Sequence, residues 1–374
     1  MKILMTGGGS GGHFYPIIAV GEAIRAVARE EKILQPDLFY MSTEPYDGKE
    51  LANLEIEFVQ VPAGKKRLYR SILNFFDKFK MGWGVIVALF KMYMIFPDVV
   101  FGKGAYTSFP AYVAARILRI PLVIHESDSV PGRVNKWAGK FAEKIALSFK
   151  EAGEYFPSDK IAYTGQPVRK EIRDVLSTGA FEYLNLEQGV PVILIVGGSL
   201  GAQIINDAIL NALPTLLNKY QIIHQVGKAN IKYVTGIADV SLEAHPHKNR
   251  YRPYEFLNTL SLKMSAGAAS LVVSRGGSFI FEIACWDLPS IIIPITNSNG
   301  DHQRKNAYNY AREGAAVVIE ESNLSSIIIA NEIDRIVSNP IILQRMKDAT
   351  KNIAQKQAST VIAKELLKIG LSHE

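Results

Sequence analysis

Five glycines and one serine form a loop from Gly7 to Gly12, directly after the apolar segment 2–6. The first, third and sixth residues of this loop fit the pattern G-x-G-x-x-G, and a helix is predicted over 17–28. Glycine lets a backbone turn sharply and approach a ligand closely, and a helix N-terminus attracts negative charge. We therefore predict a phosphate- or anion-binding turn. His13 follows it and can accept a proton near neutral pH.

Two further glycine turns lie in the second half of the chain, at 196–206 (VGGSLGAQIIN) and 274–282 (SRGGSFIFE). Each follows an apolar run that is typical of a buried strand. An NAD-dependent oxidoreductase is one interpretation, with Glu44 after the second strand holding a ribose. That class needs only one nucleotide-binding fold. The glycine turns in the second half of the chain therefore favour two Rossmann-like domains, which could bind a sugar nucleotide and an acceptor.

Apolar runs alternate with helical patterns along the whole chain, which predicts an α/β fold with doubly wound parallel sheets. We expect an N-terminal domain over 1–163, a linker over 164–190, a C-terminal domain over 191–340 and a closing helix over 341–374. The segments predicted as strands are 2–7, 37–43, 98–102, 122–127, 144–149, 191–199, 221–227, 271–277 and 289–295.

Composition limits the possible classes of protein. The 374 residues suit two domains, and a single cysteine, Cys285, excludes an internal disulfide and fits a reducing cytoplasm. Residues 1–5 lead straight into the glycine loop, so we expect no signal peptide. The apolar stretch 81–96 contains Lys91 and is shorter than the roughly 20 residues that a membrane span needs. It is interpreted as a buried or interfacial helix.

A basic and aromatic segment precedes that stretch. Residues 65–83 contain six Lys or Arg and one acid, Asp77, in a protein of net charge +6. This pattern predicts a helix that lies on an anionic membrane surface, although a core helix with a solvated basic face is the alternative. No nucleic-acid recognition module accompanies the segment. The residues expected at the membrane are Lys66, Arg70, Phe75, Phe76, Phe79 and Trp83.

Eight segments, taken in order, resemble the MurG family of N-acetylglucosaminyltransferases in glycosyltransferase family 28. They are TGGGSGGHFYP, GKGAYTSFP, VIHESDSVPGRVNK, TGQPVR, VGGSLGAQIIN, IIHQVGK, SRGGSFIFEIA and DHQRKNA. The resemblance implies a GT-B fold, in which two Rossmann-like domains face each other across a cleft. It also implies inverting transfer of GlcNAc from UDP-GlcNAc to the 4-hydroxyl of undecaprenyl-pyrophosphoryl-MurNAc-pentapeptide, which converts lipid I to lipid II. A peripheral position on the cytoplasmic face of the membrane follows. A UDP-sugar 2-epimerase of the same fold is the nearest alternative.

The resemblance also assigns residues. His13 is the expected general base, with Glu126 as a competing base or a structural partner of His125, and His13 could instead only pack the loop. The residues expected to bind substrate are Ser10, Gly11, Gly12, Asp128, Arg169, Ser199, Gly201, Glu282, Gln303 and Asn306, and those expected to bind the acceptor are Tyr106, Thr107 and Asn135. The alternatives are a solvated linker arginine for Arg169, an acid facing a helix dipole for Glu282 and a surface glutamine for Gln303.

The chain contains no Asp-x-Asp pair, so we expect an enzyme without a metal or other cofactor, in which amides and helix ends stabilise the diphosphate. It departs from the family pattern in four places. Leu200 stands where the second glycine loop usually has glutamine, and the loop SRGGSFIFE is one residue shorter than usual. HESD replaces the common HEQN, which puts Asp128 where an asparagine usually contacts the donor. GKGAY replaces a glycine-richer acceptor loop and introduces Lys103.

Overall fold

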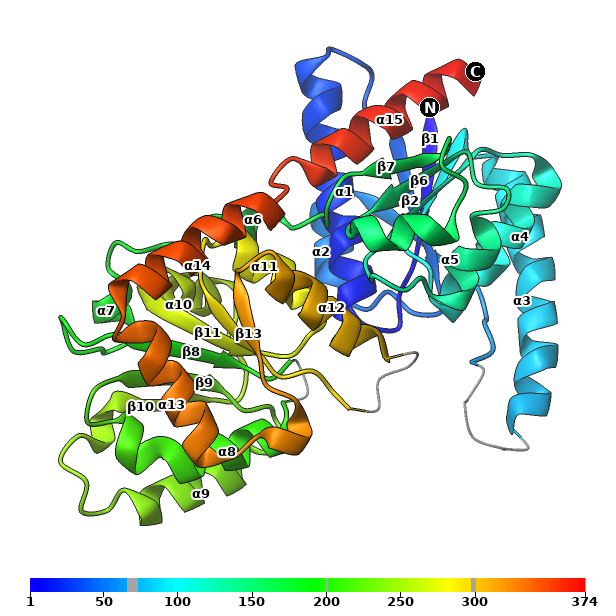
Figure 1. Ribbon diagram of the computed structural model, residues 1–374. Helices are drawn as coiled ribbons and strands as arrows, with labels where there is room; N and C mark the ends of the chain where they lie inside the picture. The colour runs from blue at the N-terminus through cyan, green and yellow to red at the C-terminus, as the bar shows by residue number, and fades with distance from the viewer. Residues whose placement is uncertain (66–72, 199–200, 297–300, 374) are drawn as a thin grey trace. The chain divides into compact units, whose positions relative to one another are not determined.

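The computed structural model describes residues 1–65, 73–198, 201–296 and 301–373. The chain forms two compact units, Met1–Lys170 with Lys356–Glu374, and Glu171–Gln355. Each unit contains one parallel sheet with helices on its faces, and Figure 1 shows the order of these elements. The predicted α/β class is confirmed in both units.

The sheet of the first unit has the strand order β3-β2-β1-β4-β5-β6-β7. Because the chain reverses direction across the sheet between β1 and β4, the loops after these two strands emerge side by side at the carboxyl edge. Thr6 at the end of β1 pairs with Gly102 at the end of β4. The strands are β1 (Lys2–Thr6), β2 (Asp37–Ser42), β3 (Ile56–Gln60), β4 (Val99–Gly102), β5 (Leu122–Glu126), β6 (Lys144–Leu147) and β7 (Ile161–Tyr163).

Helices cover both faces of this sheet. On one face α1 packs with α15, which lie alongside each other in Figure 1, and on the other α3 packs with α4. The helices are α1 (Gly11–Glu30), α2 (Gly48–Asn53), α3 (Leu73–Ile95), η1 (Tyr106–Ser108), α4 (Phe109–Leu118), α5 (Arg133–Ala138), η2 (Lys150–Tyr155) and α15 (Ala358–His373). Within the described part of the chain, none of the helices has the length and apolar character to cross a bilayer.

The sheet of the second unit has the order β10-β9-β8-β11-β12-β13, so its reversal lies between β8 and β11. The strands are β8 (Val192–Val196), β9 (Gln221–Gln225), β10 (Tyr251–Tyr254), β11 (Ala269–Ser274), β12 (Ser290–Ile292) and β13 (Ala316–Val318). The surrounding helices are α6 (Lys170–Arg173), α7 (Ala180–Tyr183), α8 (Gln203–Leu216), α9 (Ile231–Ser241), η3 (Lys248–Arg250), α10 (Thr259–Ala268), α11 (Phe279–Cys285), α12 (His302–Arg312), η5 (Glu321–Asn323), α13 (Ser326–Val337) and α14 (Pro340–Ile353).

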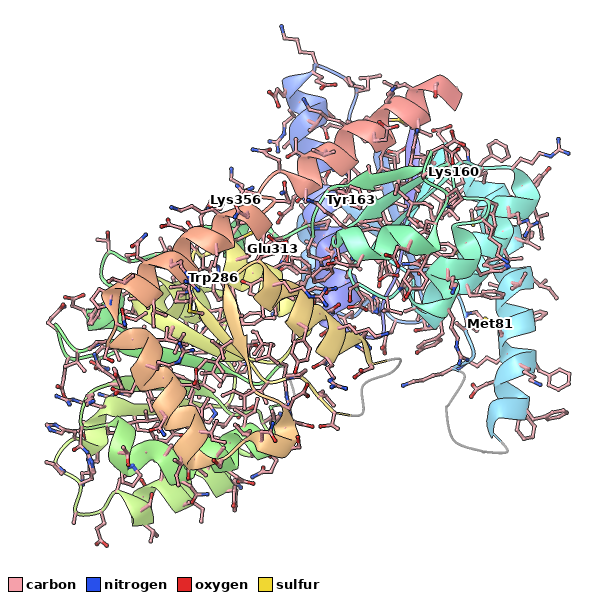
Figure 2. All side chains as sticks on the ribbon, in the orientation of Figure 1. Met81, Lys160, Tyr163, Trp286, Glu313 and Lys356 are labelled. Carbon is pink, nitrogen blue, oxygen red and sulfur yellow. The ribbon has the colours of Figure 1, made fainter. Side chains whose placement is uncertain are left out.

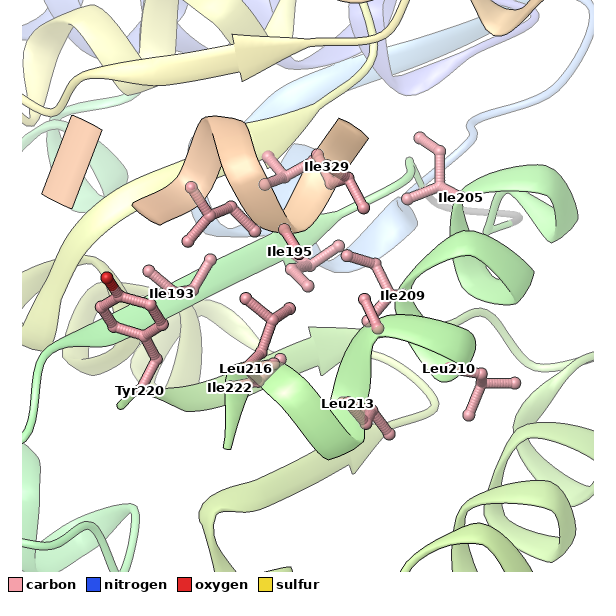
Figure 3. Packing of buried hydrophobic residues seen from close by; sticks show 14 of the residues in the cluster. Ile193, Ile195, Ile205, Ile209, Leu210, Leu213, Leu216, Tyr220, Ile222 and Ile329 are labelled. Atoms are coloured by element: carbon pink, nitrogen blue, oxygen red, sulfur yellow. The ribbon is translucent and has the colours of Figure 1, made fainter. Parts of the chain in front are cut away.

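Branched aliphatic side chains fill the core of the second unit. Ile193 and Ile195 of β8 meet Ile209 and Leu213 of α8, and Ile329 of α13 joins them, as Figure 3 shows. All five side chains are fully buried. Burying such a side chain contributes about 1.5–3 kcal/mol, so this layer fixes β8 and the glycine turn that follows it.

The structure differs from the sequence prediction at the end of the chain and around the linker. The single closing helix predicted over 341–374 is wrong: it is two helices, α14 and α15, and α15 belongs to the first unit. Within 164–190 the chain forms α6 and α7, and from Glu171 onward it packs with the second unit. The Trp286 indole nitrogen, for example, donates a hydrogen bond to the Ile172 carbonyl at 2.8 Å (Figure 2).

Candidate functional site

The first glycine loop is anchored from the end of β2. The carbonyl of Gly7 accepts hydrogen bonds from the Tyr40 and Ser42 hydroxyls, both at 2.8 Å. Gly8 and Gly9 have φ angles of +135° and +80°, which side-chain-bearing residues rarely adopt. A Cβ on Gly8 would also lie 2.7 Å from the Ser42 hydroxyl. The anchored loop leaves Gly9 and Ser10 exposed, as a ligand-binding turn requires.

The helix α1 starts immediately after this loop, six residues earlier than predicted. Its first residues are Gly11, Gly12 and His13, and the amide of His13 donates to the Ser10 carbonyl at 3.1 Å. The Ser10 side chain does not cap the helix. His13 is therefore fixed in the first turn, beside the loop and at the positive end of the helix dipole.

The loop after β4 lies against the glycine loop. The amide of Lys103 donates to the Thr6 carbonyl at 2.9 Å, and a Cβ on Gly9 would lie 3.6 Å from the Tyr106 ring. Thr107 is buried, while Tyr106 is partly exposed. Two residues predicted to bind the acceptor thus sit next to the predicted anion-binding turn.

Asn135, the third predicted acceptor residue, is committed to contacts within the protein. Its amide nitrogen donates to the His125 carbonyl at 3.0 Å and to a Glu126 carboxyl oxygen at 2.9 Å. Its amide oxygen accepts a hydrogen bond from the Tyr112 hydroxyl at 3.2 Å. The structure therefore gives Asn135 a role in holding the loops after β4 and β5, and contact with the acceptor stays a prediction.

Glu126 at the end of β5 also holds a loop. Its carboxylate accepts hydrogen bonds from the amides of Asp128 and Gly132, at 3.0 and 3.1 Å, besides the one from Asn135. Burial and the charge of Asp128 raise the pKa of Glu126 to about 7, although these donors and Lys103 oppose the rise. Because both carboxylate oxygens bind loop donors, the geometry favours the structural role over the competing base.

A buried polar cluster lies beneath these loops. The Lys103 ammonium contacts His125 Nδ1 at 2.6 Å, Ser127 Oγ, and Gln166 Oε1 at 3.4 Å. His125 Nε2 donates to the Gly165 carbonyl at 3.0 Å. Burial holds the pKa of His125 well below its usual range, and the charges of Lys103 and His13 lower it further. This cluster was not predicted from the sequence, in which only Lys103 stood out, as a departure from the family pattern.

Arg169 is held inside the first unit. Its guanidinium forms an ion pair with Glu50 at 2.9 Å and stacks on the Tyr15 ring, 4.0 Å from the centroid. Its side chain is only 7% exposed, so the alternative of a solvated linker arginine is wrong. The diphosphate contact that the family resemblance implies for Arg169 stays a prediction.

In the second unit, the turn after β8 approaches a neighbouring strand end closely. Gly201 has a φ of +77°, and a Cβ there would lie 2.0 Å from the Val226 carbonyl oxygen. The Gln225 side chain donates to the Gly198 carbonyl at 3.1 Å. Ser199 lies outside the described residues. The tight contact at Gly201 requires glycine for both conformation and space.

Replacing Gly201 with alanine is expected to destabilise the second unit by about 2–4 kcal/mol, because a methyl group would collide with rigid backbone. The matched control is Gly236→Ala in the exposed part of α9, where a Cβ meets nothing within 4 Å. That change should stabilise the helix by about 0.4–1 kcal/mol. Chemical denaturation of both variants measures the effect, and equal stability of the two would contradict the close approach.

The loops after β11 and β12 meet the start of α12. Asn306 is fully buried and its amide donates to the Gly276 carbonyl at 3.4 Å. The Gln303 amide oxygen accepts from the Ile295 amide at 3.3 Å. Arg275 forms an ion pair with Glu321 at 2.7 Å. The structure therefore brings Gln303 and Asn306 to the carboxyl edge of the second sheet, where ligands of such folds bind.

Glu282 lies in the first turn of α11 and is partly buried. This helix follows the third glycine turn, so Glu282 shares the carboxyl edge of β11 with Gly276. The position fits both readings from the sequence, a carboxylate for ribose hydroxyls and an acid at the positive end of a helix dipole.

His224 on β9 is fully buried and neutral in the second unit. It contacts Asn206 Oδ1 through Nε2 at 3.1 Å and the Tyr251 hydroxyl through Nδ1 at 3.0 Å. The Asn206 amide nitrogen donates to the Val226 carbonyl, so its oxygen accepts and His224 Nε2 carries the proton. Burial lowers the pKa of His224 to about 3. Asn206 thereby links α8 to β9 beside the glycine turn.

This histidine should make the second unit sensitive to acid. Between pH 6.5 and 3 the unfolded chain binds a proton that the native state excludes, so stability is complete above pH 6.5 and falls as the pH drops. The expected slope is about 1.4 kcal/mol per pH unit for this one group. His224→Gln should flatten it. Urea unfolding at pH 5, 6 and 7 measures the slope of unfolding free energy against pH with His224 and with Gln at this position. Trp286 fluorescence reports unfolding of the second unit once the other tryptophans are replaced by phenylalanine. Identical slopes would refute the assignment.

Helix α3 carries a row of exposed apolar side chains. Phe75, Phe76, Phe79 and Trp83 are 60–65% exposed, and the row continues with Ile86, Phe90, Tyr93 and Met94. Figure 2 shows side chains projecting along α3 around Met81. The opposite face buries Ala88 and Met92 against α4. Lys66 and Arg70 lie outside the described residues. The alternative of a core helix with only a basic solvated face is therefore wrong.

Comparison with known proteins decides the family. Two models match the chain, the glycosyltransferase family 28 N-terminal domain over residues 3–147 and the C-terminal domain over 192–366. A Bacillus cereus protein named UDP-N-acetylglucosamine–N-acetylmuramyl-(pentapeptide) pyrophosphoryl-undecaprenol N-acetylglucosamine transferase 2 is 34% identical over 369 residues, which cover 98% of this chain and 99% of the relative. The chain belongs to glycosyltransferase family 28. The resemblance seen in the sequence is confirmed, and the oxidoreductase interpretation is not supported.

Solved structures show the same fold as this family 28 chain. MurG of Acinetobacter baumannii has a TM-score of 0.74 at 23% identity, and the match covers 98% of this chain and all of that one. UDP-GlcNAc 2-epimerase from Neisseria meningitidis, bound to UDP-GlcNAc, has a TM-score of 0.68 at 14% identity and equal coverage. At these identities the likeness shows the fold alone, which is the predicted GT-B fold with its two parallel-sheet units.

Proposed function

We propose that this protein transfers GlcNAc from UDP-GlcNAc to the MurNAc 4-hydroxyl of undecaprenyl-pyrophosphoryl-MurNAc-pentapeptide, the step that converts lipid I to lipid II. The observation that carries the proposal is the match over 98% of the chain to a relative named for this transfer. Both family 28 domains are present in order. The epimerase alternative is not favoured, since its support is a likeness of fold.

The donor is assigned to the carboxyl edge of the second sheet. Gly201, Glu282, Gln303 and Asn306 lie on the loops and helices that follow β8, β11 and β12. A carboxylate can accept both ribose hydroxyls, and an amide can donate to and accept from sugar hydroxyls. In the proposal the diphosphate is stabilised by backbone amides and helix ends, with Ser199 and Arg169 as further contacts.

The acceptor is assigned to the first unit, to Tyr106 and Thr107, and the neighbouring turn Ser10–Gly12 contacts the donor in this proposal. His13 takes the proton of the MurNAc 4-hydroxyl as that oxygen attacks the anomeric carbon of GlcNAc. The bond from the anomeric carbon to UDP breaks, UDP leaves with the bonding electrons, and the configuration at that carbon inverts. Support for this role comes from the position of His13 in the first turn of α1, beside the exposed Gly9 and Ser10.

The lipid tail of the acceptor requires contact with a membrane. The exposed row on α3 supplies aromatic side chains, and exposed Lys78 and Lys80 flank it. Aromatic and basic residues on one exposed helix suit the interface of an anionic bilayer. We therefore place the protein peripherally on the cytoplasmic face of the cell membrane, where UDP-GlcNAc is available.

The test uses the purified full-length protein, radiolabelled UDP-GlcNAc and a short-chain lipid I analogue, with and without EDTA. Label in the lipid fraction is the expected result, and equal transfer with EDTA would agree with the expected metal independence. Conversion of UDP-GlcNAc to UDP-ManNAc without transfer would overturn the proposal in favour of the epimerase. Binding of UDP-GlcNAc without either reaction would indicate a binding protein.

A further inference from the structure

Two of the departures from the family pattern, at Lys103 and in the segment HESD, meet in the structure. Lys103 follows β4 and Ser127 follows β5, yet the Lys103 ammonium contacts the Ser127 hydroxyl directly. Lys103 is only 1% exposed, so its side chain lies inside the protein. Asp128 comes next in the chain, and its amide is bound to the Glu126 carboxylate. A buried cation and the loop that carries an unusual acid are thus in contact.

The hydrogen bonds around Lys103 indicate that it is protonated. An ammonium group has three protons to donate and accepts none. Three acceptors surround it, His125 Nδ1 at 2.6 Å, Ser127 Oγ, and Gln166 Oε1 at 3.4 Å. His125 Nδ1 can accept because Nε2 carries the proton that bonds to the Gly165 carbonyl. The arrangement gives each of the three protons of an ammonium group an acceptor.

A buried cation needs compensating negative charge. Burial lowers the pKa of Lys103, while the carboxylates of Glu126 and Asp128 raise it in opposition. The other titratable groups near the cluster are His125, which is neutral, and His13 on α1. The carboxylates of Glu126, at the end of β5, and of Asp128, in the loop that follows, are therefore the counter-charges of Lys103.

We propose that Lys103, Ser127 and Asp128 work as one charge-compensated set, in which Lys103 is a positioning residue. Its ammonium holds Ser127, and thereby the loop from Ser127 to Gly132, beside the turn that carries His13. It also offsets the negative charge of Asp128, which would otherwise repel a diphosphate. The catalytic part rests on the proposed function, whereas the charge compensation does not.

The test is a double-mutant cycle with Lys103→Met and Asp128→Asn, measured with the short-chain lipid I analogue. Lys103→Met should lower kcat/KM about 100-fold, because it removes the positive charge that offsets the charges of Glu126 and Asp128. Adding Asp128→Asn to that variant should raise kcat/KM again by about 10-fold, since it removes one of the two negative charges. The acid limb of the pH profile should move to higher pH in Lys103→Met and part-way back in the double variant. A purely structural lysine would give additive losses instead.

Lys160→Met is the matched control. Lys160 lies in the same unit (Figure 2) and donates to the Ala142 carbonyl at 2.8 Å, a contact that involves none of the residues of this cluster. Asp128→Asn should give no rescue of that variant. If Lys103→Met does not fold, Lys103→Gln keeps polar contacts and removes only the charge.

Thermal unfolding of the same cycle separates this proposal from the proposed function. The melting temperature of Lys103→Met should be several degrees below that of the wild-type protein. Adding Asp128→Asn should restore part of this difference, even if the wild-type protein transfers no sugar. The proposal is overturned if the double variant is no more active and no more stable than Lys103→Met.

Discussion

The variant His13→Ala is expected to transfer GlcNAc about 10²–10⁴ times more slowly than the wild-type protein. The loss should fall on kcat, because the proton of the acceptor hydroxyl has no receiver in the transition state. Binding of UDP-GlcNAc should change much less than kcat, since Gly201, Glu282, Gln303 and Asn306 of the proposed donor site lie in the other unit. Initial rates over both substrate concentrations, with binding measured by calorimetry, give the two quantities.

His245→Ala is the control for that experiment. This histidine bonds to the Pro214 carbonyl in the second unit, far along the chain from the glycine loop, and its loss should leave transfer unchanged. If His13→Ala keeps more than about a tenth of the activity, the base is another group. Glu126→Gln would then be examined next, although its carboxylate is already held by three donors.

The second large effect is expected on membrane binding. Replacing Phe76, Phe79 and Trp83 with serine should weaken binding to anionic phospholipid vesicles about 100-fold or more. These side chains are 62, 65 and 60% exposed, and burying each fully in a bilayer contributes about 1.5–3 kcal/mol. Vesicle co-sedimentation over a range of lipid concentrations measures the change. Transfer to a vesicle-bound acceptor should fall in parallel.

The same number of exposed apolar residues is available on α9 for comparison. Serine at Tyr233, Ile237 and Val240, which are 51, 42 and 77% exposed, should leave vesicle binding intact. Transfer to a short-chain acceptor in solution should be unaffected by either triple change. Equal loss of vesicle binding in both triple variants would mean that hydrophobic exposure in general, and not α3, attaches the protein to lipid.

The buried strands were predictable because strands covered on both faces appear as continuous apolar runs. All nine predicted segments contain a strand. The four strands that were missed are β3, β7, β10 and β13, the outermost strands of their sheets. Of these, β7 is largely exposed, and β10 contains Pro253. β7 and β10 therefore leave no continuous apolar run of the kind that predicts a buried strand.

The candidate site was predictable where one short segment forms it, as at His13 and its glycine loop. Contacts between distant segments were not. Lys103 meets Gln166 across 63 residues, and Arg169 meets Glu50 across 119. Because Glu126 is a carboxylate, the sequence made it a candidate base. Only the structure shows that its oxygens accept three hydrogen bonds and hold a loop. Such pairings depend on sheet order, which no local pattern specifies.

The return of α15 to the first unit bears on how the protein is made. Ile362, Leu366 and Leu367 belong to the core that α1 covers, so that core includes residues that are synthesised after the whole second unit. A growing chain can complete the second unit before the first, although the first unit begins the sequence. Until α15 is synthesised, α1 can pack on the sheet but lacks its contacts with α15. An intermediate without α15 therefore exposes apolar surface of α1, and the unit that starts the chain can be completed only after the second unit has been synthesised.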